Sequence, residues 1–309
     1  MKIFNNVLEL IGGTPLVYLN KITKDLDVRI AVKVESFNPC GSVKDRIDVR
    51  MILDAEKKNI INKDTVIVEP TSGNTGVGLS FVCAVKGYKL ILVMPENMSV
   101  ERRNLLKFLG ADLVLSPAEK GMAGAVELAE EIVKEKQNCF MPQQFNNPSN
   151  PLAHYEGTAV EIWNDTEGKV DIFVAGIGTG GTITGVGKFL KEKNSDIEVY
   201  GVEPSSSPFL TEGKAGKHRI QGIGAGFLPD VLDKSILDGI IKVGDDEAAK
   251  MCRKLAQEEG ILAGLSSGAC VWAACEIAKQ PENHGKLIVA VLPDTGERYL
   301  SLCDWILNI

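Results

Sequence analysis

From Thr65 onward, short apolar runs alternate with longer amphipathic stretches, and this alternation constrains the fold more than any other feature of the sequence. It is the pattern of strands and crossover helices in a parallel sheet. The polar segment QFNNPSNP, residues 144–151, divides the alternation into two series and predicts a crossing between two lobes. The predicted strands are 65–69, 89–94, 112–115 and 138–141 in the first series, and 170–175, 197–202 and 286–292 in the second. The predicted helices are 75–87, 99–109, 121–136, 152–165, 182–193, 245–259 and 267–279.

The expected fold class is therefore α/β, with two lobes that each contain a mostly parallel, twisted sheet flanked by helices. A chain of 309 residues also exceeds what one hydrophobic core usually fills. The early runs TPLVYLN and RIAVKVE have no alternating helices around them, so we assign them to the larger sheet. We expect a large lobe of residues 1–45 and 150–309, and a smaller, mobile lobe of residues 46–149 inserted into it.

Composition excludes several classes of function. A net charge of -7 and an isoelectric point near 5.2 argue against a nucleic-acid surface, which needs clustered positive charge. The apolar runs are far shorter than the ~18 residues of a membrane helix, and the first residues do not form a signal peptide. Seven cysteines without C-x-x-C spacing predict reduced thiols, with no disulfide framework and no metal site. We expect a cytoplasmic protein.

Two predicted strand-to-helix junctions are rich in glycine and hydroxyl side chains, and ligands collect at such junctions in open α/β sheets. The first, EPTSGNTGVG, spans residues 69–78 and brings Ser72, Asn74 and Thr75 to the start of a helix. Backbone N–H groups and the helix dipole attract a carboxylate or phosphate there. The alternative interpretation is an ordinary capped turn.

The second junction contains Gly176, Gly178 and Gly181 in the G-x-G-x-x-G spacing of dinucleotide-binding loops. Glu203 follows 22 residues after Gly181, where such a site places an acidic residue for the ribose. The motif alone is weak evidence, because the two hydroxyl groups of residues 178–182 suit one compact phosphate better. The pattern indicates an anion site and leaves the dinucleotide alternative open.

Lys44 lies in NPCGSVKDRIDVRM, where Ser42 and Asp45 resemble a capping box at the start of a helix. The positive end of the helix dipole disfavours a protonated lysine in the first turn. Its presence suggests a use for the neutral amine, such as a Schiff base. An exposed lysine without such a role is the alternative.

The segment GLSSGA contains Gly264, Ser266 and Gly268 in the G-x-S-x-G spacing of a hydrolase nucleophile elbow. The elbow requires a preceding strand and an acid before the histidine of the triad. Here a helix is predicted before Ser266, and His284 precedes Asp294. We expect no serine hydrolase, and the simpler alternative is that Ser266 or its neighbour caps the next helix.

Six motifs, NPCGSVKDR, EPTSGNTG, GIGTGGT, IQGIGAGF, GLSSGA and LPDTGERYL, together closely resemble the cysteine synthases (O-acetylserine sulfhydrylases). These are pyridoxal-phosphate enzymes of fold type II, the fold of the tryptophan synthase β subunit. The resemblance extends from IGGTPLV at residue 11 to the C-terminus, in the family's order and spacing. It implies a two-lobed α/β enzyme with pyridoxal 5'-phosphate as its cofactor.

The resemblance also implies a role for each matching residue. Lys44 would hold the cofactor as an aldimine and act as the general base, Asn74 would bind the ring hydroxyl, and Ser266 would face the pyridine nitrogen. The phosphate would be bound by Gly178, Thr179, Gly180, Gly181 and Thr182. The substrate α-carboxylate would be bound by Thr71, Ser72, Thr75 and Gln144.

The implied reaction replaces the acetate of O-acetyl-L-serine with sulfide and gives L-cysteine, by way of an α-aminoacrylate. The resemblance further implies a homodimer, and IQGIGAGF, residues 220–227, resembles the region near which the C-terminal tail of serine acetyltransferase docks. Asp48 stands where a small residue is common, and EGTAVEIW, residues 156–163, departs from the family pattern. These departures leave the acceptor preference open. The sequence as a whole also leaves open the sulfur donor and any role of Cys40.

Other activities share parts of this pattern. A cystathionine β-synthase-like enzyme would use the same core with serine or O-acetylserine and a thiol acceptor. A serine or threonine dehydratase fits TSGNTG and GIGAGF less well. A catalytically silent binding module is disfavoured because Lys44 and Asn74 are both present, and a nicotinamide enzyme would explain only one of the six motifs.

Overall fold

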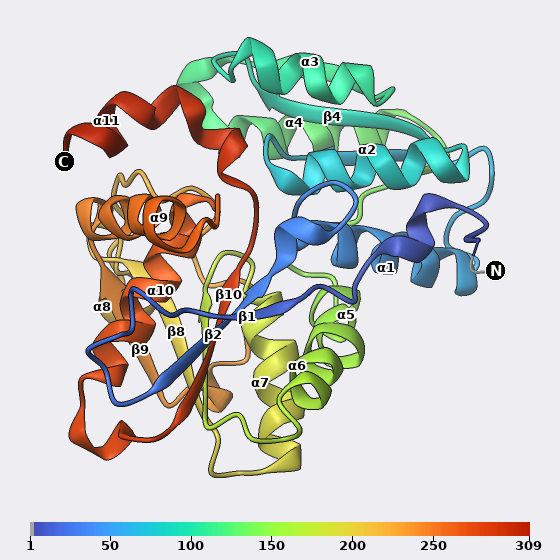
Figure 1. The fold of residues 1–309 in the computed structure, drawn as a ribbon. Helices are drawn as coiled ribbons and strands as arrows, with labels where there is room; N and C mark the ends of the chain where they lie inside the picture. Colours follow the sequence, from blue (N-terminus) through green and yellow to red (C-terminus); the bar gives the residue numbers. More distant parts are fainter. Residues whose placement is uncertain (1–2) are drawn as a thin grey trace. The chain divides into compact units, whose positions relative to one another are not determined.

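The computed structural model describes residues 3–309 and contains two compact units, each with its own sheet (Figure 1). Unit 1 comprises the residues up to Ile11 together with Lys44–Ser149, and unit 2 comprises Gly12–Val43 and Asn150–Ile309. Both sheets are mostly parallel and carry helices on their faces, as the sequence predicts for an α/β fold. The mobility of the smaller lobe stays a prediction.

Unit 1 is built on a four-stranded, fully parallel sheet in the order β5-β4-β3-β6. Val68, Ile91 and Val93 face α4 on one side of this sheet, where they pack against Ala125 and Ala129. Helix α2 packs against β4 and against α1. The strands are β3 (Val66–Pro70), β4 (Lys89–Pro95), β5 (Asp112–Ser116) and β6 (Cys139–Phe140), and the α-helices are α1 (Lys44–Lys57), α2 (Asn74–Lys86), α3 (Val100–Phe108) and α4 (Gly121–Glu135).

Unit 2 is built on a six-stranded sheet in the order β1-β2-β10-β7-β8-β9, in which only the edge pair β1–β2 is antiparallel. The strands are β1 (Leu16–Tyr18), β2 (Arg29–Val34), β7 (Ile172–Gly176), β8 (Glu198–Pro204), β9 (Gly239–Val243) and β10 (Leu287–Leu292). The α-helices are α5 (Ser149–Ala153), α6 (Ala159–Asp165), α7 (Gly181–Lys193), α8 (Phe209–Glu212), α9 (Asp245–Glu259), α10 (Leu265–Ala278) and α11 (Cys303–Asn308).

The strands of unit 2 are apolar on both faces because helices cover both faces. Val32 and Val174 belong to one buried cluster with α9 and α10, whereas Phe173 and Val199 belong to another with α6 and α7. Figure 1 shows α9 and α10 on one side of this sheet and α6 and α7 on the other. Because helices cover both faces, ligands can reach this sheet at the carboxyl ends of the central strands, where loops follow.

The structure differs from the sequence predictions in several elements, including the short helices α8 and α11, which were not predicted. The edge strand β9 was not predicted, because its five residues begin with glycine and are mostly half-buried. The single helix predicted over 152–165 is interrupted, since His154–Thr158 forms a π-helical turn between α5 and α6. The assignment of TPLVYLN and RIAVKVE to the larger sheet is confirmed by β1 and β2.

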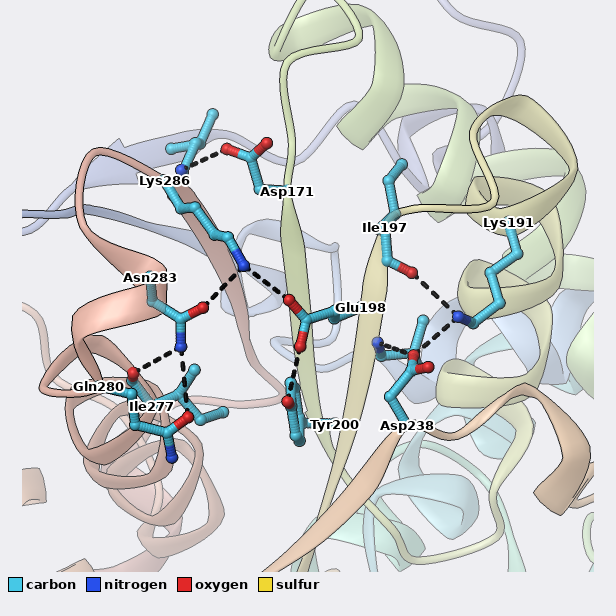
Figure 2. A network of polar contacts seen from close by, with 12 residues as sticks. Asp171, Lys191, Ile197, Glu198, Tyr200, Asp238, Ile277, Gln280, Asn283 and Lys286 are labelled. Carbon is cyan, nitrogen blue, oxygen red and sulfur yellow. Dashed lines mark hydrogen bonds and ion pairs between the residues drawn. The ribbon is translucent and has the colours of Figure 1, made fainter.

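A paired polar network ties the amino ends of the unit 2 strands (Figure 2). Lys286 contacts Glu198 at 2.7 Å and Asn283 at 2.8 Å, and the Tyr200 hydroxyl donates to Glu198 at 2.7 Å. Burial works against ionisation of Glu198, but the bonds from Lys286 and Tyr200 prevail and lower its pKa. A carboxylate with its partners in place stabilises the sheet and is not available for a ligand.

Candidate active site

Lys44 is the first residue of α1, so the predicted first-turn position is confirmed. The chain just before it is held to the end of β10: Val43 donates its N–H to the carbonyl of Pro293 at 2.8 Å, and Ser42 bridges to Asp294. Ser42 lies two residues before the helix. The backbone just before Lys44 is therefore held in place by hydrogen bonds. Lys44 itself is half-buried at the amino end of α1, where the helix dipole favours the neutral form of its amine.

Asp48 lies one turn after Lys44 on α1 and is fully buried. Neither of its carboxyl oxygens has a hydrogen-bond partner among residues 3–309. Burial, together with the neighbouring Asp45, raises the pKa of Asp48 well above its usual value, although Lys44 works in the opposite direction. The side chain fills the space beside Gly78 of α2, where a Cβ atom would collide with the carboxyl group. The departure at position 48 is thus accommodated by a glycine on the facing helix.

The loop from β3 to α2 carries the predicted carboxylate-binding residues. The Thr71 hydroxyl accepts from the N–H of Gly73 at 3.3 Å, and α2 begins at Asn74 without a side-chain cap. Arg102 of α3 donates to the carbonyl of Ser72 at 3.4 Å. An uncapped helix start with nearby hydroxyl groups is suited to binding an anion.

Gln144 is brought to this loop by a side-chain contact, with the Thr75 hydroxyl donating to its Oε1 at 2.6 Å. The backbone of the same segment is held by Glu69, which accepts from the N–H of Gln143 at 2.9 Å and from that of Gln144 at 3.2 Å. Glu69 is a residue that the sequence reasoning missed. The only local sign of its role is that it is an acidic residue at the end of a buried strand. Its hydrogen-bond partners follow more than seventy residues later in the sequence.

The second glycine loop follows β7 in unit 2 and opens α7 at Gly181. Gly180 has φ +84°, a left-handed conformation that glycine adopts without strain. A Cβ atom on Gly178 would collide with the carbonyl oxygen of Gly222, and one on Gly181 would collide with the side chain of Asn150. The loop of residues 178–182, called the cradle below, is therefore closely packed, and backbone atoms rather than side chains form much of its surface.

Two polar residues that the sequence reasoning missed orient the hydroxyl groups of this cradle. Asn150 donates to the Thr179 hydroxyl at 3.1 Å, and His154 contacts the Thr182 hydroxyl at 3.2 Å through its Nε2 atom. The other ring nitrogen of His154 contacts Thr158 at 2.9 Å within the π-helical turn. Asn150 lies in the polar segment 144–151, which we interpreted as a crossing between two lobes, and His154 lies in the helix predicted over 152–165.

Ser266 lies in the first turn of α10 and is 3% exposed. The interpretation of Ser266 or Ser267 as a helix cap is wrong, because Gly264 occupies the cap position and both serines lie inside the helix. Gly222 faces the Ser266 hydroxyl, with 3.9 Å between an added Cβ atom and Oγ. Gly222 also contacts Gly178, so the motif IQGIGAGF lies against both the glycine loop and Ser266.

Glu203, considered above as a ribose-binding residue, has other partners. It accepts from the N–H of Leu210 at 2.9 Å and from the N–H and hydroxyl of Thr211 at 3.2 and 2.5 Å. A carboxylate with three donors is occupied in holding its own loop. The dinucleotide interpretation thereby loses its acidic residue.

The residues present fit pyridoxal phosphate on the structural evidence. The unit 2 cradle has the close backbone approach, the helix start and the hydroxyl groups that a compact phosphate needs. Unit 1 supplies an amine at the start of α1 and, at the start of α2, the loop that the sequence predicts to bind a carboxylate. Within each unit, part of the predicted set lies together: Thr75 contacts Gln144 in unit 1, and Gly222 lies between the glycine loop and Ser266 in unit 2.

The sequence model of the pyridoxal-phosphate dependent enzymes matches residues 7–294. The chain belongs to this family. It is 53% identical over 298 residues to the cysteine synthase of Staphylococcus aureus (strain N315), and the match covers 96% of each chain.

Solved structures show the same similarity over 97% of the chain. The cysteine synthase of Entamoeba histolytica has a TM-score of 0.94 and 45% identity, with 90% of its own chain covered. A hydrogen sulfide-producing enzyme of Fusobacterium nucleatum has a TM-score of 0.93 and 48% identity, with 99% covered. An O-ureido-L-serine synthase has a TM-score of 0.93 and 44% identity, with 94% covered.

Each helix within residues 3–309 is too short or too polar to cross a lipid bilayer.

Proposed function

We propose that the protein is a cysteine synthase, which replaces the acetate of O-acetyl-L-serine with sulfide to form L-cysteine. The observation that carries this proposal is the 53% identity to a cysteine synthase across 96% of both chains. The two anion-binding loops and the helix-start lysine support it. Bound pyridoxal phosphate supplies the electron sink that permits loss of the α-proton and of the β-substituent.

Lys44 would hold the cofactor, and its amine would accept the α-proton of the substrate. Its place at the positive end of α1 favours the neutral amine that both tasks need. Residues 178–182 would hold the phosphate, Asn74 would bind the ring hydroxyl, and Ser266 would face the pyridine nitrogen. A neutral serine at this position would leave that nitrogen largely unprotonated, which would favour β-replacement over transamination.

The substrate carboxylate is bound by the loop at the start of α2. Thr71, Ser72 and Thr75 supply hydroxyl groups there, and Gln144 supplies its amide. Binding at this point orients the α-carbon for proton removal by Lys44 and helps to exclude water.

The proposal is tested by visible absorption of the purified protein before and after addition of O-acetylserine, followed by sulfide. We expect a Schiff-base band that shifts with O-acetylserine and returns with sulfide. Borohydride reduction and peptide mass spectrometry should find the cofactor on Lys44, and not after Lys44→Ala. Lys120→Ala, an exposed lysine of unit 1, is the control. A band that ignores O-acetylserine but responds to serine would instead support the cystathionine β-synthase-like alternative.

The partners and the cellular location are also proposals. We infer a homodimer that works in the cytoplasm, and a docking site near residues 220–227 for the C-terminal tail of serine acetyltransferase. The seven free cysteines are consistent with a reducing compartment. Sedimentation analysis tests the dimer. A tail peptide that neither binds nor inhibits the enzyme would remove the docking site.

A further inference from the structure

Glu69 is a buried carboxyl group at the carboxyl end of β3, with 2% exposure. Its two oxygens accept from two consecutive backbone N–H groups, those of Gln143 and Gln144. Hydrogen bonds from backbone N–H groups to a carboxylate are stronger than those between neutral groups. Glu69 therefore holds one short segment of chain against the end of the strand that leads into the carboxylate-binding loop.

The held segment has an unfavourable backbone conformation. Gln143 has φ +55°, in the left-handed region that a residue with a side chain rarely adopts. Its carbonyl accepts from the N–H groups of Asn146 and Asn147 at 2.9 and 3.0 Å. Such strain persists only where surrounding contacts compensate for it, and the two bonds to Glu69 do so here.

The conformation of this segment determines where the Gln144 side chain lies. The Thr75 hydroxyl donates to its Oε1 at 2.6 Å. The amide NH₂ group is the only hydrogen-bond donor of the Gln144 side chain, so an anion would be bound through it. A change in the backbone at Gln143 would displace this donor from the start of α2.

We propose that Glu69 is a positioning residue for substrate binding: its ionised carboxylate fixes the backbone of Gln143 and Gln144, and its protonation releases Gln144 from the carboxylate-binding loop. The inference rests on the proposed function and adds a residue and a pH dependence to it. Glu69 acts through Gln144 and does not itself contact substrate.

The charge state of Glu69 changes near neutral pH. Burial raises its pKa to about 7, although the bonds from Gln143 and Gln144 act in the opposite direction. Above this pH the carboxylate accepts both bonds, and below it one oxygen carries a proton and loses acceptor capacity. Substrate affinity should therefore fall as the pH falls through about 7.

Charged and titratable groups lie on the elements packed against β3. Helix α1 brings Asp48, which interacts with Glu69 as well as with Asp45 and Lys44. Helix α2 brings Cys83, whose burial, with Asp48 nearby, raises its thiol pKa to about 12. On the neighbouring strands, Lys89 of β4 and Cys139 of β6 pair with Val66, at the opposite end of β3. Helix α4 packs on the Val68 face of the sheet.

The first experiment follows the amide signals of the holoenzyme labelled with ¹⁵N-glutamine. The six glutamines are Gln137, Gln143, Gln144, Gln221, Gln257 and Gln280. We expect the backbone amides of Gln143 and Gln144 to titrate together with a midpoint near pH 7, and this titration to vanish in Glu69→Gln. Signals that do not titrate, or that titrate equally in the variant, would overturn the proposal.

The second experiment measures KM and kcat for O-acetylserine against pH. We expect Glu69→Gln to raise KM roughly tenfold above pH 7.5, to remove its pH dependence near 7, and to leave kcat within about threefold. Glu69→Asp, which keeps an ionisable group, should restore part of the pH dependence. A loss confined to kcat, or an unchanged KM profile, would contradict the positioning role.

Glu203→Gln is the matched control, because Glu203 also follows a valine, precedes a proline and accepts from two consecutive backbone N–H groups, in unit 2. It should keep the pH profile of the wild type. Thermal unfolding and cofactor absorbance of each variant show that the protein has folded. A wild-type holoenzyme whose absorbance does not respond to O-acetylserine would refute the proposed function. An enzyme that does respond, but whose Gln143 and Gln144 amide signals do not change with pH, would refute only the role of Glu69.

Discussion

The loops that open α2 in unit 1 and α7 in unit 2 follow the same plan but are stabilised in different ways. Each connects the end of a parallel strand to a 13-residue helix that begins without a side-chain cap. In unit 2, Cβ atoms on Gly178 and Gly181 would collide with their surroundings. In unit 1, a Cβ atom on Gly73 would meet nothing within 4 Å.

This difference agrees with the two anions proposed for the loops. A cofactor phosphate stays in place, so a cradle formed by close backbone packing costs no reorganisation when substrate arrives. A substrate carboxylate enters and leaves in each turnover, and a loop held by a few side-chain hydrogen bonds can adjust to it. Substitutions of the loop glycines should therefore affect stability and cofactor binding in unit 2, and substrate binding in unit 1, where Lys44 and Asn74 are the residues proposed to bind the cofactor.

The largest effect is expected for Gly178→Ala in the unit 2 loop. The added methyl group meets the carbonyl oxygen of Gly222, a backbone atom that cannot rotate away as a side chain can. Overpacking of this kind costs about 1–3 kcal/mol. Urea unfolding should show this loss, and absorbance after dialysis should show weakened retention of the cofactor. Wild-type stability with full cofactor retention would mean that the cradle is not rigid.

The next effect tests the support behind the unit 1 loop. In Gly78→Ala the new methyl group meets the Asp48 carboxyl, and we expect a loss of about 1–2 kcal/mol in unfolding free energy. In an Asp48→Ala background the space is vacant, so the same change should cost little. The coupling in this double-mutant cycle, measured by urea unfolding, should therefore be about 1 kcal/mol or more. Additive effects would show that the two residues do not compete for one space.

The same regions show how far sequence reasoning reaches. Most strands and helices were predicted because apolar periodicity is local, and the fold class followed from their alternation. Lys44 was predicted at the start of its helix from a local motif in the same way. Strand β9 was missed because an edge strand buries too little to leave a clear apolar pattern.

The supporting residues of the site could not be predicted, because their partners are distant in sequence. Glu69 binds a segment more than seventy residues away, and Asn150 binds Thr179 across 29 residues. The π-helical turn that directs His154 to Thr182 has no periodic signature, and we predicted an uninterrupted helix there. The sequence motifs were enough to identify the groups proposed to contact ligands. The residues that orient those groups could be identified only from the three-dimensional structure.

A smaller effect, confined to substrate binding, is expected for Thr75→Val. The change is nearly isosteric but removes the hydroxyl that donates to Gln144. Loss of one such bond is worth about 1 kcal/mol, so KM for O-acetylserine should rise several-fold while cofactor retention stays unchanged. Ser80→Ala is the control, because its buried hydroxyl donates to the Gly76 carbonyl within the same helix. An equal change in both variants would indicate a general weakening of α2.

The smallest effect on stability is expected for Gly73→Ala, and it tests the comparison most directly. Gly73 has φ -108°, which alanine can adopt, and its surroundings are open. We expect a change of about 0.5 kcal/mol in unfolding free energy, since alanine is a poorer helix cap than glycine. Cofactor retention should equal that of the wild type, and any increase in KM should be specific to the amino-acid substrate. If Gly73→Ala lost cofactor as Gly178→Ala should, the backbone of the unit 1 loop would matter as much for cofactor retention as that of the unit 2 loop, and the contrast between an adjustable loop and a rigid one would be wrong.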